Sequence, residues 1–197
     1  GDTKNYDYTK NTETTEPKIT ERIIDFADII GQESAKRGLM IAAAGSHHIL
    51  LYGPPGVGKT LLARALPTIL PPLTLQEQLQ VTQIYSCAGL TNNLHNLIQT
   101  RPFREVHQST TNIAMLGGGN RLAPGEISLA HQGILFLDEI AEFPRSILEA
   151  LRQPLEERSI NISRINGSIK FPAHFTLIAS MNPCPCGYFG DSKKNCT

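Results

Sequence analysis

One octapeptide decides the fold: Gly53-Pro54-Pro55-Gly56-Val57-Gly58-Lys59-Thr60, which matches the pattern G-x-x-x-x-G-K-[ST] at every defined position. An apolar run at 48–52 precedes it and a helical pattern at 60–66 follows it, which is the context that a phosphate-binding loop requires. Glycines let the backbone curl so that successive N–H groups point at phosphate oxygens. The segment therefore predicts a binding site for the phosphates of a nucleotide.

The polar side chains of this loop have separate predicted roles. Lys59 is expected to reach the β- and γ-phosphates, and the Thr60 hydroxyl is expected to ligate Mg²⁺. The nucleotide-contacting set is predicted to comprise Gly53, Pro54, Pro55, Gly56, Val57, Gly58, Lys59, Thr60 and Leu61. The alternative is a glycine-rich turn with a chance lysine, and the strand and helix on either side disfavour it.

Two carboxylates follow a second apolar run, at 133–137. Asp138 can hold the water shell of Mg²⁺, and Glu139 can polarise an attacking water as a general base. The alternative is that the pair caps the next helix, a position that Asp and Glu also favour. Because the pair follows a buried strand and lies downstream of a complete phosphate loop, the catalytic interpretation is favoured.

A third apolar run, at 175–179, leads to Asn182. Ligands of parallel α/β sheets bind at the carboxyl ends of strands, so Asn182 is expected beside the two sites above. Its amide can hold a water molecule or the γ-phosphate by hydrogen bonds. Alternatively, Asn182 begins a turn before Pro183. The residues by themselves favour neither interpretation.

The order of the predicted elements gives the fold class. Helices are predicted at 33–44, 60–66, 75–88 and 145–151, between and beside the three strands, and 91–119 reads as mixed helix and loop. Strands separated by helices indicate an α/β fold with a parallel sheet flanked by helices.

A β-hairpin is predicted ahead of the third strand, within 159–172. Asn166-Gly167 is a strong signal for a two-residue turn, which would place Arg164 opposite Ile169 and Ile162 opposite Phe171. One face of this hairpin would then carry the apolar side chains of Ile160, Ile162, Ile169 and Phe171.

Composition limits the classes of partner. The chain has 18 Lys and Arg against 18 Asp and Glu, so a globally basic nucleic-acid surface is excluded and any DNA contact must rest on local charge. No apolar run is long enough to span a bilayer and no signal peptide is visible, so we expect a cytoplasmic protein without a membrane partner. Residues 1–21 are polar and are expected to be a flexible linker, with the folded core at 22–197.

Three of the four cysteines lie near the end of the sequence, at Cys184, Cys186 and Cys196. Without a secretory signal, such a cluster indicates reduced thiols or a metal site rather than a disulfide framework. The three thiolates are candidate ligands of Zn²⁺, which takes four ligands in tetrahedral geometry. The alternative is a surface loop of reduced cysteines.

Together these motifs resemble the AAA+ ATPases of the magnesium-chelatase-like family. The resemblance runs from about residue 23 to residue 197, and its glycine-to-histidine and Cys-Pro-Cys-Gly blocks are more specific than a phosphate loop. The matching segments are 28–32, 53–60, 117–119, 124–131, 133–140, 151–156 and 181–187.

The resemblance implies roles that the residues alone do not give. Ile30 and Gly31 would line the adenine pocket, and Asn182 would be the sensor that reads the γ-phosphate. The hairpin would be the insertion before the sensor strand, which faces the pore in ring ATPases of this clade, and 91–119 would carry a second insertion. His131 would either cap a short helix or contact the nucleotide region.

The resemblance also implies a function: hydrolysis of ATP with Mg²⁺ in a ring, expected to be a hexamer, that moves DNA as a helicase or branch-migration motor. A metal-insertion motor and an ATP-switched interaction module are the alternatives. The family's arginine finger and helical lid, and a further cysteine that would close the zinc site, are expected beyond residue 197. The chain as it stands is therefore expected to bind nucleotide, to hydrolyse it slowly and to be monomeric.

Overall fold

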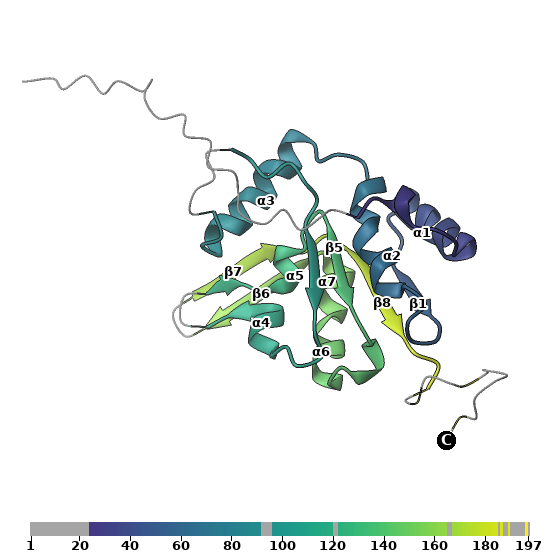
Figure 1. Ribbon diagram of the computed structural model, residues 1–197. Helices are drawn as coiled ribbons and strands as arrows, with labels where there is room; N and C mark the ends of the chain where they lie inside the picture. Colours follow the sequence, from purple (N-terminus) through teal and green to yellow (C-terminus); the bar gives the residue numbers. More distant parts are fainter. Residues whose placement is uncertain are drawn as a thin grey trace, which may run out of the picture.

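The computed structural model describes residues 24–91, 96–119, 122–164, 167–184, 186, 189 and 196. The linker expected at 1–21 and the turn residue Asn166 lie outside these residues. A four-stranded parallel sheet forms the centre of the described part, with helices packed on it (Figure 1). Its strands follow the order β1 (Ile49–Tyr52), β8 (Thr176–Met181), β5 (Ile134–Leu137) and β2 (Phe103–Val106). The α/β fold with a parallel sheet is thus confirmed.

Helices fill the chain between these strands. The helices predicted at 33–44, 60–66 and 75–88 are confirmed, with ends that shift by a residue or so, whereas the one predicted at 145–151 is followed directly by a second short helix. The helical segments are η1 (Phe26–Asp28), α1 (Glu33–Gly45), α2 (Lys59–Ala65), η2 (Leu66–Ile69), α3 (Leu75–Cys87), α4 (Asn112–Leu116), α5 (Glu126–Leu129), η3 (Ile140–Glu142), α6 (Arg145–Ala150) and α7 (Arg152–Glu157). None of the described helices has both the length and the hydropathy needed to cross a bilayer.

Strand β2 corrects the interpretation of 91–119 as helix and loop. It pairs in parallel with β5, with Phe103 opposite Ile134 and Val106 opposite Leu137. Its central charge is neutralised locally, because Arg104 donates from Nε and from one terminal nitrogen to the two carboxylate oxygens of Glu126, over 2.6 and 2.8 Å. Because the middle of this strand is charged, it lacks the apolar run by which the other three strands were predicted.

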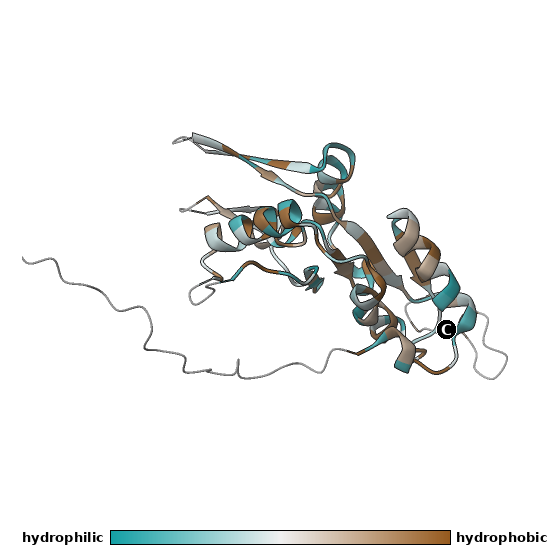
Figure 2. Cartoon of the chain, turned by 90° about the horizontal axis from the view of Figure 1, so that it is seen from above, coloured by the Kyte–Doolittle hydropathy of each residue, from teal (hydrophilic) through white to brown (hydrophobic). Residues whose placement is uncertain are grey.

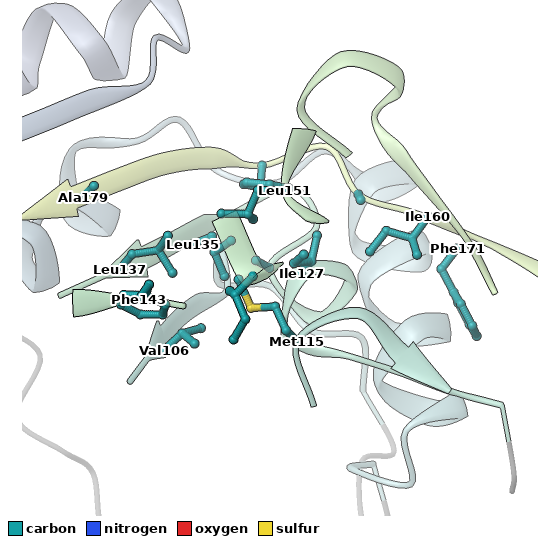
Figure 3. Close-up of a cluster of buried hydrophobic side chains, with 14 of the residues drawn as sticks. Val106, Met115, Ile127, Leu135, Leu137, Phe143, Leu151, Ile160, Phe171 and Ala179 are labelled. Atoms are coloured by element: carbon teal, nitrogen blue, oxygen red, sulfur yellow. The ribbon is translucent and has the colours of Figure 1, made fainter. Parts of the chain in front are cut away.

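Successive side chains along the central strand β5 pack into two different hydrophobic cores, one on each face of the sheet. Leu135 and Leu137 belong to one core, whereas Ile134 and Phe136 belong to the other, and all four side chains are fully buried. Figure 2 shows the hydrophobic residues running along the central strands, and Figure 3 shows the first core, where side chains of β5 and α5 meet Ile160 and Phe171. A strand buried on both faces is continuously apolar, as the sequence of β5 is.

The hairpin forms, but its register differs from the predicted one. Strands β6 (Ser159–Arg164) and β7 (Gly167–Pro172) pair Ile162 with Ile169 and Arg164 with Gly167, so the predicted pairing of Ile162 with Phe171 is wrong by two residues. A shift of two leaves the same side chains on the same face, so the hydrophobic pattern could not distinguish the two registers. In the observed register Ile160 lies opposite Phe171, and both are buried in the core.

The hairpin's apolar face is only partly buried. Ile160, Ile162 and Phe171 pack against the core, but Ile169 is 39% exposed where the hairpin extends from the sheet (Figure 1). A second, two-residue ladder joins β3 (Gly117–Gly118) to β4 (Ala123–Pro124). It packs against the hairpin, because a Cβ on Gly117 would lie 2.9 Å from Cδ1 of Ile162.

Candidate functional site

The loop between β1 and α2 has the backbone that its glycines predict. Gly56 and Gly58 have φ angles of 78° and 89°, in the left-handed region that only glycine adopts at no steric cost. Lys59, the first residue of α2, folds back over the loop and donates from Nζ to the carbonyl oxygens of Gly53 and Pro54, at 2.7 and 2.9 Å. The ammonium group is thus held above the loop's own backbone.

Asp138 follows β5 at the carboxyl edge of the sheet and faces the loop. The Thr60 hydroxyl donates to its Oδ2 over 3.2 Å, and the Ser180 hydroxyl donates to its Oδ1. Carboxylate and hydroxyl oxygens are the ligands that Mg²⁺ prefers, and those of Thr60 and Asp138 lie side by side. The donor set therefore fits the predicted metal.

Ser180 is a member of the site that sequence reasoning missed. This fully buried β8 residue both orients Asp138 and accepts a hydrogen bond from the Glu139 backbone N–H, at 2.9 Å. The available signal was a hydroxyl near the end of a mainly apolar strand, two residues before Asn182. Buried polar groups need partners, and here the partners are the acidic pair.

Asn182 connects the loop to the acidic pair. Its Oδ1 accepts from Lys59 Nζ at 3.0 Å, and its Nδ2 donates to Oε1 of Glu139 at 3.1 Å. Asn182 therefore contacts both of the other residues predicted to be catalytic, although the three come from different segments. A residue that only began a turn would not need these contacts.

The electrostatics of Lys59 follow from this enclosure. Partial burial lowers the pKa of its ammonium group, and the negative charges of Asp138 and Glu139 oppose the shift. Two carboxylates thus compensate a cation that has lost part of its hydration. A bound polyphosphate would add to that compensation.

The segment predicted to contact adenine lies against the loop. Gly31 has a φ angle of 78°, and the Gln32 side chain donates from Nε2 to the carbonyl of Val57 over 3.2 Å. The Ile30 side chain is 96% exposed, so an apolar base could cover it. A role for Ile30 and Gly31 in binding adenine stays a prediction.

The three clustered cysteines are brought together just beyond Asn182. Their sulfur atoms are separated by 3.1 Å (Cys184 to Cys186), 3.4 Å (Cys186 to Cys196) and 3.5 Å (Cys196 to Cys184). Cys184 also lines a cavity of about 500 Å³ together with Glu139 and Asn182. The fourth cysteine, Cys87 on α3, is exposed.

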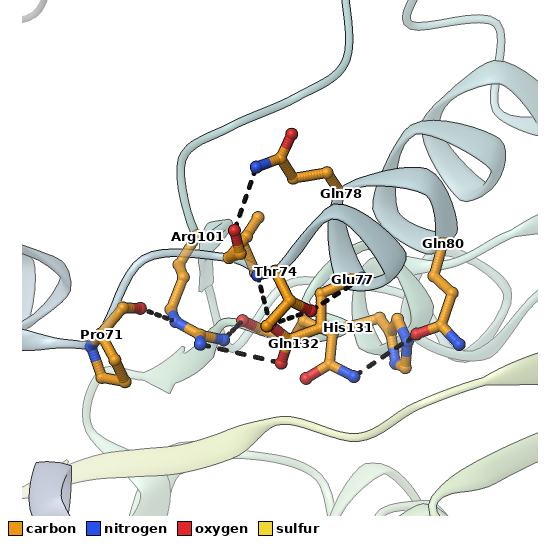
Figure 4. A network of polar contacts seen from close by, with 9 residues as sticks. Pro71, Thr74, Glu77, Gln78, Gln80, Arg101, His131 and Gln132 are labelled. Atoms are coloured by element: carbon orange, nitrogen blue, oxygen red, sulfur yellow. Dashed lines mark hydrogen bonds and ion pairs between the residues drawn. The ribbon is translucent and has the colours of Figure 1, made fainter.

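A separate polar network lies at the opposite, amino-terminal edge of the sheet (Figure 4). Arg101 donates to the carbonyl oxygens of Pro71 and Gln132, at 2.6 and 2.7 Å, and lies 3.8 Å from Glu77. The buried His131 accepts the His174 backbone N–H on Nδ1. His131 precedes β5 whereas the loop faces its far end, so the expectation of a nucleotide contact by His131 is wrong.

Fold and site together define a class of protein. A parallel sheet with a phosphate loop after one strand, an Asp-Glu pair after the next but one and an asparagine after the strand between them is the nucleotide-binding core of an AAA+ ATPase. The chain belongs, more particularly, to the family described as magnesium chelatase, subunit ChlI, whose model matches residues 25–197.

Relatives and solved structures agree with this assignment. The chain is 52% identical over 173 residues to the protein YifB of Salmonella typhimurium (88% of this chain, 34% of YifB). It is also 52% identical over 166 residues to the competence protein ComM of Haemophilus influenzae (84% of this chain, 32% of ComM). The chain thus spans about a third of the length of these curated relatives.

Two more distant likenesses widen the comparison. RuvB, a Holliday junction branch migration complex subunit of Limosilactobacillus reuteri, is 29% identical over 178 residues (87% of this chain, 43% of RuvB). A structure of the complex between magnesium chelatase subunits BchI and BchD matches with a TM-score of 0.62 at 24% identity, over 82% of this chain and 56% of that one. The structural likeness shows the shared fold.

Proposed function

We propose that this chain binds Mg-ATP and forms the hydrolytic core of a motor that acts on DNA. The observation that carries the first part is the contact of Lys59 with Asn182 and of Asn182 with Glu139, beside Thr60 and Asp138. These are the groups that phosphoryl transfer to water needs: a cation for the phosphates, a carboxylate base and an amide for the terminal phosphate.

Each residue has a distinct task in this proposal. Lys59 leaves its loop carbonyl partners and binds phosphate oxygens, while Asn182 keeps its amide near the terminal phosphate. Glu139, held by Asn182, accepts the proton of the attacking water on its carboxylate. Thr60 and Asp138 would hold Mg²⁺, which would supply positive charge to the phosphate oxygens.

The DNA part of the proposal rests on the relatives. One is named for competence and another for branch migration at Holliday junctions, and both align with most of this chain. The chain has no net charge, so DNA contacts would come from local elements such as the exposed Lys170 on the hairpin. The longer protein would act as a ring, expected to be a hexamer, with helicase or branch-migration activity.

Metal insertion is the second candidate, because the family model and one solved neighbour carry the name of magnesium chelatase. A third candidate, an ATP-switched interaction module, would bind ATP with little turnover. The experiment that separates the three is an ATPase assay on the protein at the length of its relatives, with and without single-stranded DNA.

Stimulation by DNA supports the DNA motor. Turnover that DNA does not affect, but that a porphyrin together with partner subunits of the protein raises, supports metal insertion. ATP binding without turnover under any of these conditions supports the switch. A Glu139→Gln variant in the same assay controls for contaminating ATPases, because it should retain binding and lose turnover.

A further inference from the structure

Three thiol groups converge on one point directly after the candidate nucleotide site. The three sulfur separations, from 3.1 to 3.5 Å, are nearly equal. Each separation is far longer than a disulfide bond of about 2.05 Å, so no two of the three sulfurs are bonded to each other. All three are therefore available to one metal ion. Cysteine sulfurs gathered around a common centre are the ligand set of a soft or borderline metal ion.

Zinc fits this geometry. Zn–S bonds of about 2.3 Å in a tetrahedron place sulfurs about 3.8 Å apart, so the thiolates would move apart by less than ~1 Å. The backbone N–H of Phe189 donates to Cys184 Sγ at 3.2 Å, which would stabilise the charge of a metal-bound thiolate. In the described part of the chain the cluster contains these three cysteines alone, so water or a residue elsewhere would be the fourth ligand.

The cysteine cluster begins only two residues after Asn182 in the sequence. Asn182 immediately follows the last residue of β8, and Pro183 alone separates it from Cys184. Sheet pairing fixes the backbone up to Met181, whose partner on β1 is Tyr52. The Gly53 N–H donates to the carbonyl oxygen of Met181 at 3.2 Å. Beyond that point, Cys184 Sγ lies against the sulfurs of Cys186 and Cys196 and accepts the Phe189 N–H, so these contacts act on the backbone next to Asn182.

Asn182 and Cys184 of the cysteine cluster also line the same cavity. Cys184, Asn182 and Glu139 all line the cavity of about 500 Å³ at the carboxyl edge of the sheet. Movement of Cys184 would therefore change the same space in which Asn182 contacts Glu139.

We propose that Cys184, Cys186 and Cys196 bind one Zn²⁺ ion and that the bound ion fixes Asn182 in the position that distinguishes ATP from ADP. The metal part stands on the sulfur geometry alone. The second part rests on the proposed function, because it requires Asn182 to read the terminal phosphate. Zinc is a positioning group here, with no contact to the nucleotide.

The metal part is tested by elemental analysis of the 197-residue chain purified without chelator. We expect about one zinc per chain, with X-ray absorption showing at least three sulfur ligands. The triple variant Cys184→Ser, Cys186→Ser, Cys196→Ser should contain none, while the control Cys87→Ser should contain as much as the unmodified chain. Absence of metal, or iron or copper in place of zinc, would overturn the assignment.

The coupling is tested by calorimetric affinities for Mg-ATP and Mg-ADP, before and after removal of zinc by a chelator. We expect the preference for ATP over ADP to fall about tenfold without zinc, the effect of losing one hydrogen bond to a charged group. Added zinc should restore the preference, which shows that the chain has stayed folded. In Asn182→Ala the preference should be low already and insensitive to zinc.

An unchanged preference after zinc removal would overturn the coupling and leave the metal site standing. So would a zinc effect that persists in Asn182→Ala, because the ion would then act through another residue. A chain that bound neither nucleotide would contradict the proposed function together with the coupling. The zinc content would still decide the metal part.

Discussion

The side-chain amide of Asn182 donates to Oε1 of Glu139 over 3.1 Å. The contact spans the carboxyl ends of neighbouring strands, β8 and β5, and Lys59 approaches the same amide from the loop. A change at any one of these residues therefore acts on the position of the other two.

Replacing Lys59 by alanine should abolish ATP binding. The loop would keep its amides but lose the cation that faces the β- and γ-phosphates. Isothermal calorimetry with Mg-ATP measures the loss, and Lys170→Ala, which removes an exposed lysine on β7, should leave affinity intact. Equal affinity in the Lys59 variant would sink the phosphate-loop assignment.

Replacing Glu139 by glutamine should preserve Mg-ATP binding and slow hydrolysis by about a hundredfold or more, the range for loss of a general base. Asp138→Asn should instead weaken the affinity for Mg²⁺. The control is Glu149→Gln, on the exposed side of α6, where the carboxylate pairs with Arg145. Normal turnover by the Glu139 variant of the longer protein would place the base elsewhere.

Acid should destabilise the chain through His131. Burial lowers the pKa of this imidazole to about 4 in the folded state, with a smaller contribution from His174. Nδ1 already accepts the His174 N–H, so a proton there would set two donors face to face. The neutral form is favoured by folding, so its contribution is complete above pH ~6.5 and is lost as pH falls toward 4.

The loss through His131 should reach about 3 kcal/mol at pH 4. Urea unfolding at a series of pH values measures it, and His131→Gln should flatten the slope between pH ~6.5 and 4. His47→Gln is the control, since His47 is exposed. An equal slope in all three proteins would assign the acid sensitivity to other groups.

Replacing Arg158 by glycine should stabilise the fold by about 0.5–1 kcal/mol, because glycine adopts left-handed backbone without the Cβ penalty. Arg158 ends α7 with a φ angle of 55°. Glycine at Gln153, inside the same helix, should have the opposite effect and destabilise by about 1 kcal/mol. Thermal unfolding of the two variants gives the signs, and a loss of stability in Arg158→Gly would contradict the strain argument.

The chemistry of the site could be predicted because its motifs are local. The loop and the acidic pair each lie within a few residues, directly beside an apolar strand, so their position at the sheet edge follows from the strand itself. The mutual contacts could not be predicted, because they depend on strand order. The placement of β8 between β1 and β5 brings Asn182 to both partners and puts Ser180 beneath Asp138.

The missed features have physical reasons too. Strand β2 carries Arg104 and Glu105 at its centre, and its β character depends on pairing with β5 and on the ion pair with Glu126. The predicted hairpin register was wrong because Asn166-Gly167 was taken as the turn, whereas Gly167 is paired with Arg164. The face pattern could not correct this, because a shift of two residues leaves the same side chains on the same face. The pairing of Ile160 with Phe171 and of Ile162 with Ile169 is seen only in the structure.

Strand β1 has a consequence for how the protein behaves in solution. Within the described residues it pairs with β8 alone, so the backbone groups along its outer edge lack strand partners there, and Leu50 and Tyr52 are 50% and 58% exposed. A short apolar edge is a template onto which another chain can add a strand. Association between folded chains, rather than unfolding, should therefore set the highest concentration at which this chain stays in solution. Replacing Leu50 by lysine should raise that concentration.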